Sequence, residues 1–69
     1  MAIVKLTDET WYETETARVL ECLKAWLPPE GMAVAEVKAR LLANGFSHTD
    51  AEFTEIARRL VAGGKIVLT

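Results

Sequence analysis

The stretch LLANGFSHTDAEFTEIARRL, residues 41–60, predicts the end of one helix, a tight turn and most of a second helix. Asn44-Gly45 is typical of a helix C-cap, because glycine adopts the left-handed backbone conformation without steric cost. Phe46 follows at the position where a Schellman motif places an apolar residue against the preceding helix, here against Leu41. The stretch therefore predicts that a helix ends at about residue 43.

The second half of the stretch predicts a helix over about residues 49–62. Thr49 and Glu52 have the spacing of a capping box, which marks a helix start. Apolar residues then recur at helical spacing along one face, at Phe53, Ile56, Ala57 and Leu60. Gly63-Gly64 is expected to end this helix.

Residues 32–43, just before the turn, predict a helix of about three turns. Val34, Val37 and Leu41 fall on one face of this helix, and its charged residues fall elsewhere. The quoted turn therefore joins two helices.

A longer helix is predicted nearer the N-terminus. Thr10 and Glu13 form a second capping-box pattern, and Pro28-Pro29 ends the helix close to Leu27, because proline disfavours helical dihedrals in the residue before it. The apolar stripe of this helix consists of Tyr12, Val19, Leu20, Leu23, Trp26 and Leu27.

Short, β-branched, apolar segments flank the three helices. Residues 2–6 and residues 65–69 each predict a strand. Each of these strands needs a partner, and pairing with each other would leave neither alone. We therefore predict a single domain over residues 1–69, mostly α with a small β element, in the order β-α-α-turn-α-β and with terminal strands able to pair.

Composition limits the function classes. The 69 residues are 51% apolar and 26% charged, with a formal net charge of −2, which fits one small soluble domain. A chain of this length buries only about 60% of its unfolded surface, so a deep enclosed active site is not expected. Cys22 and His48 are the only cysteine and histidine, too few for an internal disulfide or a four-ligand zinc site. We expect no enzyme activity, no metal, no cofactor and no small-molecule substrate.

The cellular location is predicted from two further absences in the sequence. No apolar run has the length of a signal-peptide core or of a membrane span. Together with the single cysteine, this indicates a cytoplasmic protein without a membrane partner.

The segment from Gly31 to Leu68 resembles a winged helix-turn-helix domain. The resemblance rests on Gly31-Met32-Ala33-Val34 leading into a helix, on the Asn44-Gly45-Phe46-Ser47 turn, and on the ending Leu60-Val61-Ala62-Gly63-Gly64-Lys65-Ile66-Val67. In this family the helix after the turn is usually the recognition helix, and a short strand leads into the wing. The chain departs from the family at residues 65–69, where a second wing strand would follow, so the wing is expected to be truncated or missing.

The resemblance implies a small DNA-binding regulator or accessory protein that reads duplex DNA with the helix at about 49–62. A homodimer is expected, because one short module with few cations would bind weakly. Hydroxyls and cations suit contacts to phosphates and base edges. The candidate nucleic-acid-binding residues are Lys38, Arg40, Ser47, His48, Thr49, Thr54, Arg58, Arg59 and Lys65.

Two observations limit this DNA interpretation. The cations also fit a solvated surface with no further function, and His48 has no catalytic partner in the sequence. Asp50, Glu52 and Glu55 lie on the first two turns of the candidate recognition helix, where they would repel a polyanion.

The charge distribution supports an alternative function, an acidic protein-interaction module on the same scaffold without DNA binding. Such a module could be a small inhibitor or adaptor of phage or mobile-element type. Residues 1–30 carry six acids against three cations, and an exposed tryptophan there would be an anchor for a protein partner. For that tryptophan, packing into the core is the alternative. The candidate protein-interaction residues are Trp11, Glu9, Glu13 and Glu15.

Overall fold

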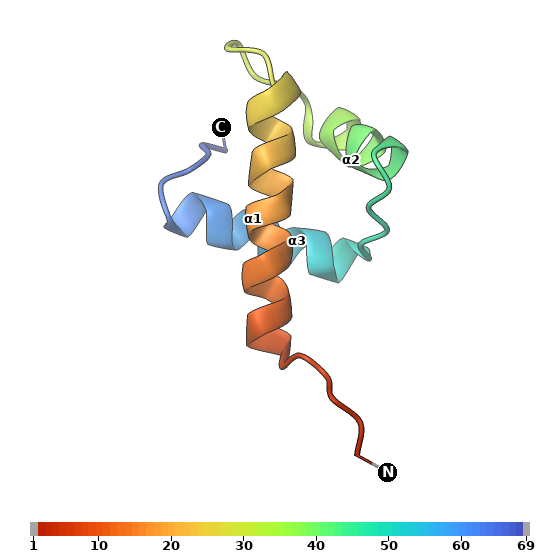
Figure 1. Ribbon diagram of the computed structural model, residues 1–69. Coiled ribbons are helices and arrows are strands. Elements are labelled where there is room, and N and C mark those ends of the chain that lie inside the picture. The colour runs from red at the N-terminus through yellow and green to blue at the C-terminus, as the bar shows by residue number, and fades with distance from the viewer. Residues whose placement is uncertain (1, 69) are drawn as a thin grey trace.

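The structure is a computed structural model that describes residues 2–68. It contains helices α1 (Asp8–Trp26), α2 (Val34–Ala43) and α3 (Asp50–Ala62). The principal helix–helix contact joins α1 and α3, which cross each other, while α2 lies to one side (Figure 1). The predicted number and order of helices is therefore confirmed.

The predicted β element is wrong. The structure has no strand within residues 2–68, and residue 69 of the predicted second strand lies outside the described part of the chain. Residues 2–6 project away from the start of α1, whereas residues 65–68 turn back toward its opposite end (Figure 1). The two segments are thus too far apart to pair, and a lone segment of five residues gains too little from an extended conformation to form a strand.

Local hydrogen bonds fix the turn between α2 and α3 as predicted. Gly45 has a φ of +93°, and the backbone N–H of Phe46 donates to the Leu41 carbonyl over 3.1 Å, which is the long bond of a Schellman motif. Leu41 and Phe46 are both buried. Thr49 and Glu52 form the predicted capping box at the start of α3.

The bounds of α1 and α2 differ slightly from those predicted. Thr7, not Thr10, caps α1, because the Thr7 hydroxyl accepts a hydrogen bond from the Thr10 backbone N–H over 3.2 Å. The helix still ends next to the proline pair, at Trp26. Helix α2 begins at Val34, two residues later than predicted.

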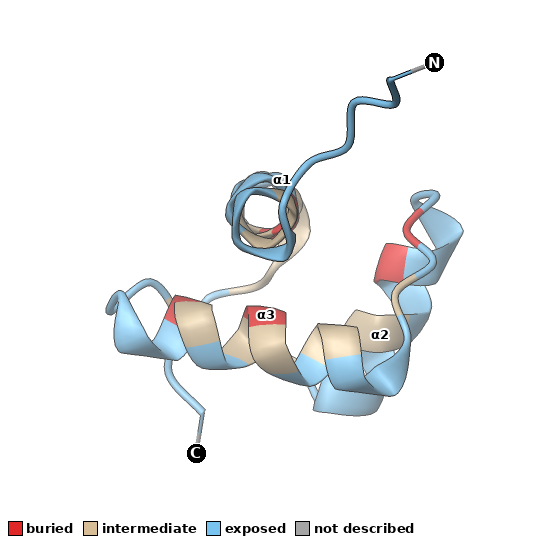
Figure 2. Ribbon diagram, turned by 90° about the horizontal axis from the view of Figure 1, so that it is seen from below, coloured by how far each residue is buried: buried red, intermediate tan, exposed pale blue. Residues whose placement is uncertain are grey.

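The core is small and draws on all parts of the helical framework. Buried positions of α3 face α1 (Figure 2). The buried apolar side chains are Val19, Leu23, Leu41, Phe46, Ile56 and Leu60. Because α2 and the following turn contribute only Leu41 and Phe46 to this set, α2 is held mainly by one end.

Candidate binding groove

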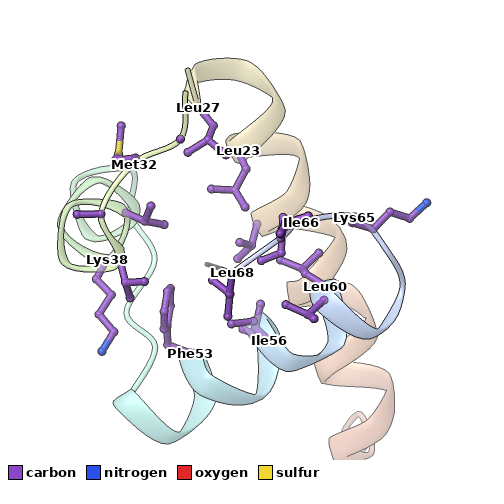
Figure 3. A pocket seen from close by; sticks show the side chains of 18 of the residues that line it. Leu23, Leu27, Met32, Lys38, Phe53, Ile56, Leu60, Lys65, Ile66 and Leu68 are labelled. Atoms are coloured by element: carbon purple, nitrogen blue, oxygen red, sulfur yellow. The ribbon is translucent and has the colours of Figure 1, made fainter. Parts of the chain in front are cut away.

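An apolar groove opens between the C-terminal half of α1, α2, α3 and the segment that follows α3. Its volume is about 1300 Å³. Figure 3 shows side chains from all of these elements directed toward one shared space. Its floor is formed by side chains of the core and its immediate neighbours, namely Val19, Leu23, Val37, Phe53, Ile56 and Leu60.

Two chain reversals create the walls of this groove. Pro28-Pro29 and Gly31, whose φ is +89°, separate the end of α1 from the start of α2. At the end of α3, Gly64 has a φ of +70° and the Lys65 N–H donates to the Leu60 carbonyl over 2.9 Å. This second Schellman geometry turns residues 65–68 back across the groove.

The groove keeps apolar side chains accessible to solvent. Val34 from α2, Val61 from α3 and Leu68 from the last segment are 50%, 41% and 59% exposed. These three residues lie around the groove, on three different elements. A surface of this kind is typical of a binding site for another apolar surface.

The lining residues of the groove carry a positive formal charge, but two of their three cations are paired with carboxylates next to the groove, Lys38 with Asp50 and Arg58 with Glu55. Lys38, Arg58 and Lys65 line the groove with Glu30 as its only acid. The remaining chain holds five cations and nine acids. The groove thus has a formal charge of +2 and the remainder a formal charge of −4.

Both arginines of α3 that were predicted to bind DNA form ion pairs with carboxylates of the same domain. Arg58 donates to both oxygens of Glu55, with its Nε and Nη2 at 2.9 and 2.6 Å. Arg59 donates to both oxygens of Glu9 over 2.8 Å, and its Nε donates to Glu55 over 2.7 Å. The hydrogen bonds from Arg58 and Arg59 lower the pKa of Glu55 to about 2. The four side chains form a charge-neutral network.

His48 lies inside the domain rather than on its surface. Its Nε2 is 2.9 Å from Oε1 of Glu15, and their side chains are only 7% and 11% exposed. Arg18 donates to the other oxygen of Glu15 over 2.7 Å. Burial raises the pKa of Glu15, but hydrogen bonds from His48 and Arg18 outweigh it and leave this pKa below its ordinary value. The carboxylate accepts, so Nε2 of His48 carries the hydrogen.

Other predicted DNA contacts also have partners within the domain. Nζ of Lys38 is 3.2 Å from Asp50 and 5.1 Å from the ring centre of Phe53. The guanidinium of Arg40 lies 5.2 Å from the ring centre of Trp26.

The remaining predicted DNA contacts are three hydroxyls and a lysine. Thr49 caps α3, and Ser47 and Thr54 are exposed. Within residues 2–68, Lys65 makes no ion pair. Of the nine predicted contacts, the groove brings together Lys38, Thr54, Arg58 and Lys65.

The four residues of the predicted acidic protein-interaction site do not form one accessible acidic surface. Glu9 pairs with Arg59, and Glu15 is buried beside His48. Trp11 is half-buried and contacts Tyr12 edge-on, with ring centres 4.9 Å apart. Glu13 alone of the three acids is exposed without an ion pair inside the described range.

Sequence reasoning missed the residues that wall the groove. Residues 65–69 were predicted to form a strand, and Met32 and Val61 were named only as part of the predicted helix and of the winged-helix pattern, not as binding residues. The sequence did contain one indication of this surface. Val61 lies off the apolar stripe of its helix, and three further apolar residues, 66–68, follow shortly after Gly63-Gly64. Several apolar residues outside the core stripe and close together in the sequence favour a second apolar contact, whereas a single one does not.

Comparison with known proteins adds no relative to this description. No family model, no curated protein and no solved structure matches the chain. In the part of the chain that the structure describes, none of the helices has the length and apolar character needed to span a bilayer. The same residues contain no cluster of side chains suited to hold a metal ion.

Proposed function

We propose that this domain is a protein-interaction module that binds an apolar segment of a partner protein in the groove between its three helices. The observation that carries the proposal is the groove itself, with Val34, Val61 and Leu68 exposed around an apolar floor. Burying such side chains releases about 25 cal/mol per Å² of apolar surface, which is the main driving force of protein association.

Charge further defines the partner. Lys65, the lining cation without an ion pair within residues 2–68, favours a segment with a carboxylate beside its apolar residues. Complementary charge raises the association rate and disfavours wrong orientations. The partner segment is therefore expected to be apolar at its centre and acidic at one flank, and the reducing cytoplasm is the compartment we propose for the complex.

The experiment compares binding partners of two double variants in lysate of the organism that encodes the protein. Val34→Asp with Leu68→Asp places two carboxylates in the groove, at positions exposed enough to leave the core intact. Ala35→Asp with Leu42→Asp adds the same charge at exposed positions outside the groove. A partner should bind the wild type and the control with the same affinity. Its affinity for the groove variant should be at least tenfold lower. Identical protein profiles for all three chains would reject the proposal.

DNA binding through α3 is a second proposal, supported by the α2-turn-α3 arrangement and by the exposure of Thr54 and Arg58. The Arg58–Glu55 pair is solvent-exposed, and such pairs contribute at most about 1 kcal/mol, so a phosphate can compete for the guanidinium. A homodimer would double the number of phosphate contacts.

The DNA proposal is tested by titrating the isotope-labelled domain with mixed-sequence duplex at low and moderate salt. Salt-sensitive amide shifts at residues 47–59, weakened by Arg58→Ala with a lower salt slope, would support it. Lys24→Ala, a cation at the surface of α1 outside the groove, is the control. Absence of shifts at low salt would remove DNA as a partner.

A further inference from the structure

We infer that the groove of one copy receives residues 2–6 of a second copy of this chain. The inference rests on the same groove as the proposed function and names an occupant that regulates access to it. Both halves of the contact are present in a single molecule, yet the fold holds them apart (Figure 1).

The inserted segment is unusually apolar for a part of the chain without contacts to the core. Ile3, Val4 and Leu6 are 77%, 95% and 60% exposed. None of them belongs to the buried core, and only Leu6 lies beside side chains of α1, Trp11 and Tyr12. Leaving three large aliphatic side chains in water is unfavourable, and a second molecule can remove them from water.

The reach of the segment fits such an exchange. Residues 2–6 project from the start of α1 (Figure 1). This projection contributes to the elongated shape of the molecule, whose extents along its three principal axes are 51, 25 and 21 Å. Five extended residues span about 17 Å. The segment can therefore enter the groove of a neighbour while its own helix α1 stays outside.

Charge favours this orientation. The segment is followed directly by Asp8 and Glu9 in the first turn of α1, and Glu13 follows one turn later. Glu9 is paired with Arg59, but Asp8 and Glu13 make no ion pair within residues 2–68, so the end of the molecule that would approach the groove is acidic and can face Lys65 at the edge of the groove. Lys5 is the only cation within the inserted segment.

A second copy bound in this way competes with any other partner. The groove is then open at low concentration and closed by self-association at high concentration. Reciprocal insertion in a two-fold dimer buries both segments and leaves no groove open for further copies.

The test measures the mass of the full chain by light scattering and sedimentation from about 1 μM to 1 mM. Val4→Asp disables the inserted segment and Leu68→Asp disables the groove, both at exposed positions. Each is expected to weaken self-association at least tenfold, whereas Leu42→Asp, also exposed but outside the groove, leaves it unchanged.

Mixing the two variants distinguishes this contact from any other apolar association. A Val4→Asp copy keeps an intact groove and a Leu68→Asp copy keeps an intact segment, so their mixture is expected to form heterodimers although neither variant self-associates. Isotope-filtered nuclear Overhauser effects between differently labelled wild-type copies should connect Val4 and Leu6 with Val61 and Leu68.

Two outcomes would overturn the inference. One is a chain that stays monomeric at 1 mM, and the other is a dimer that neither single variant weakens. Both leave the proposed function standing, because partner capture is measured at low concentration with a groove variant. Loss of groove-dependent capture together with intact self-association would reject the proposed function alone.

Discussion

The turn at residues 44–49 and the segment at residues 65–68 are set by the same local motif, but only the first motif is followed by a buried residue. A glycine in the left-handed conformation lies in the turn, Gly45, and directly before the last segment, Gly64, and at each place a Schellman-type hydrogen bond follows. After Gly45 the next residue, Phe46, is buried against Leu41. After Gly64 the chain stays largely exposed, with Val67 at 82%. A local motif therefore sets the direction of the chain, and the available apolar surface decides whether the chain then packs.

The largest loss of stability is expected from a substitution in the core between α1 and α3. Ile56 is 1% exposed, so Ile56→Ala leaves a cavity and is expected to cost about 2–5 kcal/mol, enough to unfold much of a domain of this size. Leu68→Ala, at an exposed position, should cost less than about 0.5 kcal/mol. Urea denaturation followed by circular dichroism measures both. Equal costs would mean that the last segment packs as tightly as the core.

Gly45→Ala tests the left-handed cap of α2. The φ of +93° is strained for a residue with Cβ, and the expected loss of stability is about 1–2 kcal/mol. Gly63→Ala is the control, because Gly63 has a φ of −82° and an added Cβ would meet its nearest atom at an ordinary 3.4 Å. A similar loss for both variants in thermal denaturation would contradict the role of backbone conformation.

Thr49→Ala tests the capping box that starts α3 immediately after the packed turn. Removal of the side-chain acceptor leaves the Glu52 N–H without its partner and is expected to cost about 1 kcal/mol. Thr54→Ala, at an exposed position within the same helix, should be neutral or slightly stabilising because alanine has the higher helix propensity. The two urea midpoints should therefore move in different directions or by clearly different amounts.

The smallest effect concerns the exposed network of Arg58, Arg59, Glu55 and Glu9. The folded pKa of Glu55, about 2, lies below its ordinary value of 4.5. Its contribution to stability is therefore complete above about pH 4.5 and is lost as the pH falls toward 2. Glu55→Gln should flatten the dependence of Tm on pH in this window, measured by thermal melts from pH 2 to 6. An unchanged slope would show that this network adds no stability.

The contrast between the two glycine turns also explains what could be predicted from the sequence. The Asn44-Gly45-Phe46 turn and the Thr49–Glu52 box were predicted correctly, because each closes its hydrogen bonds within six residues. The helices were found for the same reason, since their apolar periodicity reports directly on the core. The start of α1 was predicted wrongly because Thr7 and Thr10 are both suitable N-cap residues and lie in one short polar stretch.

The terminal strands and the site required information that no local pattern contains. A strand depends on a partner brought close by the whole fold, and residues 2–6 and 65–68 are directed to different ends of α1. Likewise, the Glu9–Arg59 pair joins residues 50 positions apart, and the Glu15–His48 pair joins residues 33 positions apart. The candidate DNA-binding cations were recognised as cations, but their carboxylate partners followed only from the way α3 crosses α1.

Helix α1 carries both tryptophans, and their different surroundings give the domain two optical probes. Trp11 contacts Tyr12 and His48, whereas Trp26 contacts Arg40, and fifteen residues of helix place them about 22 Å apart along the axis. Trp26 is adjacent to Leu27, which lines the groove, and its buried Nε1 has no hydrogen-bond partner in the described part of the chain. Occupation of the groove is therefore expected to change the emission of Trp26 through its neighbour Leu27, so the unlabelled protein reports its own binding by fluorescence.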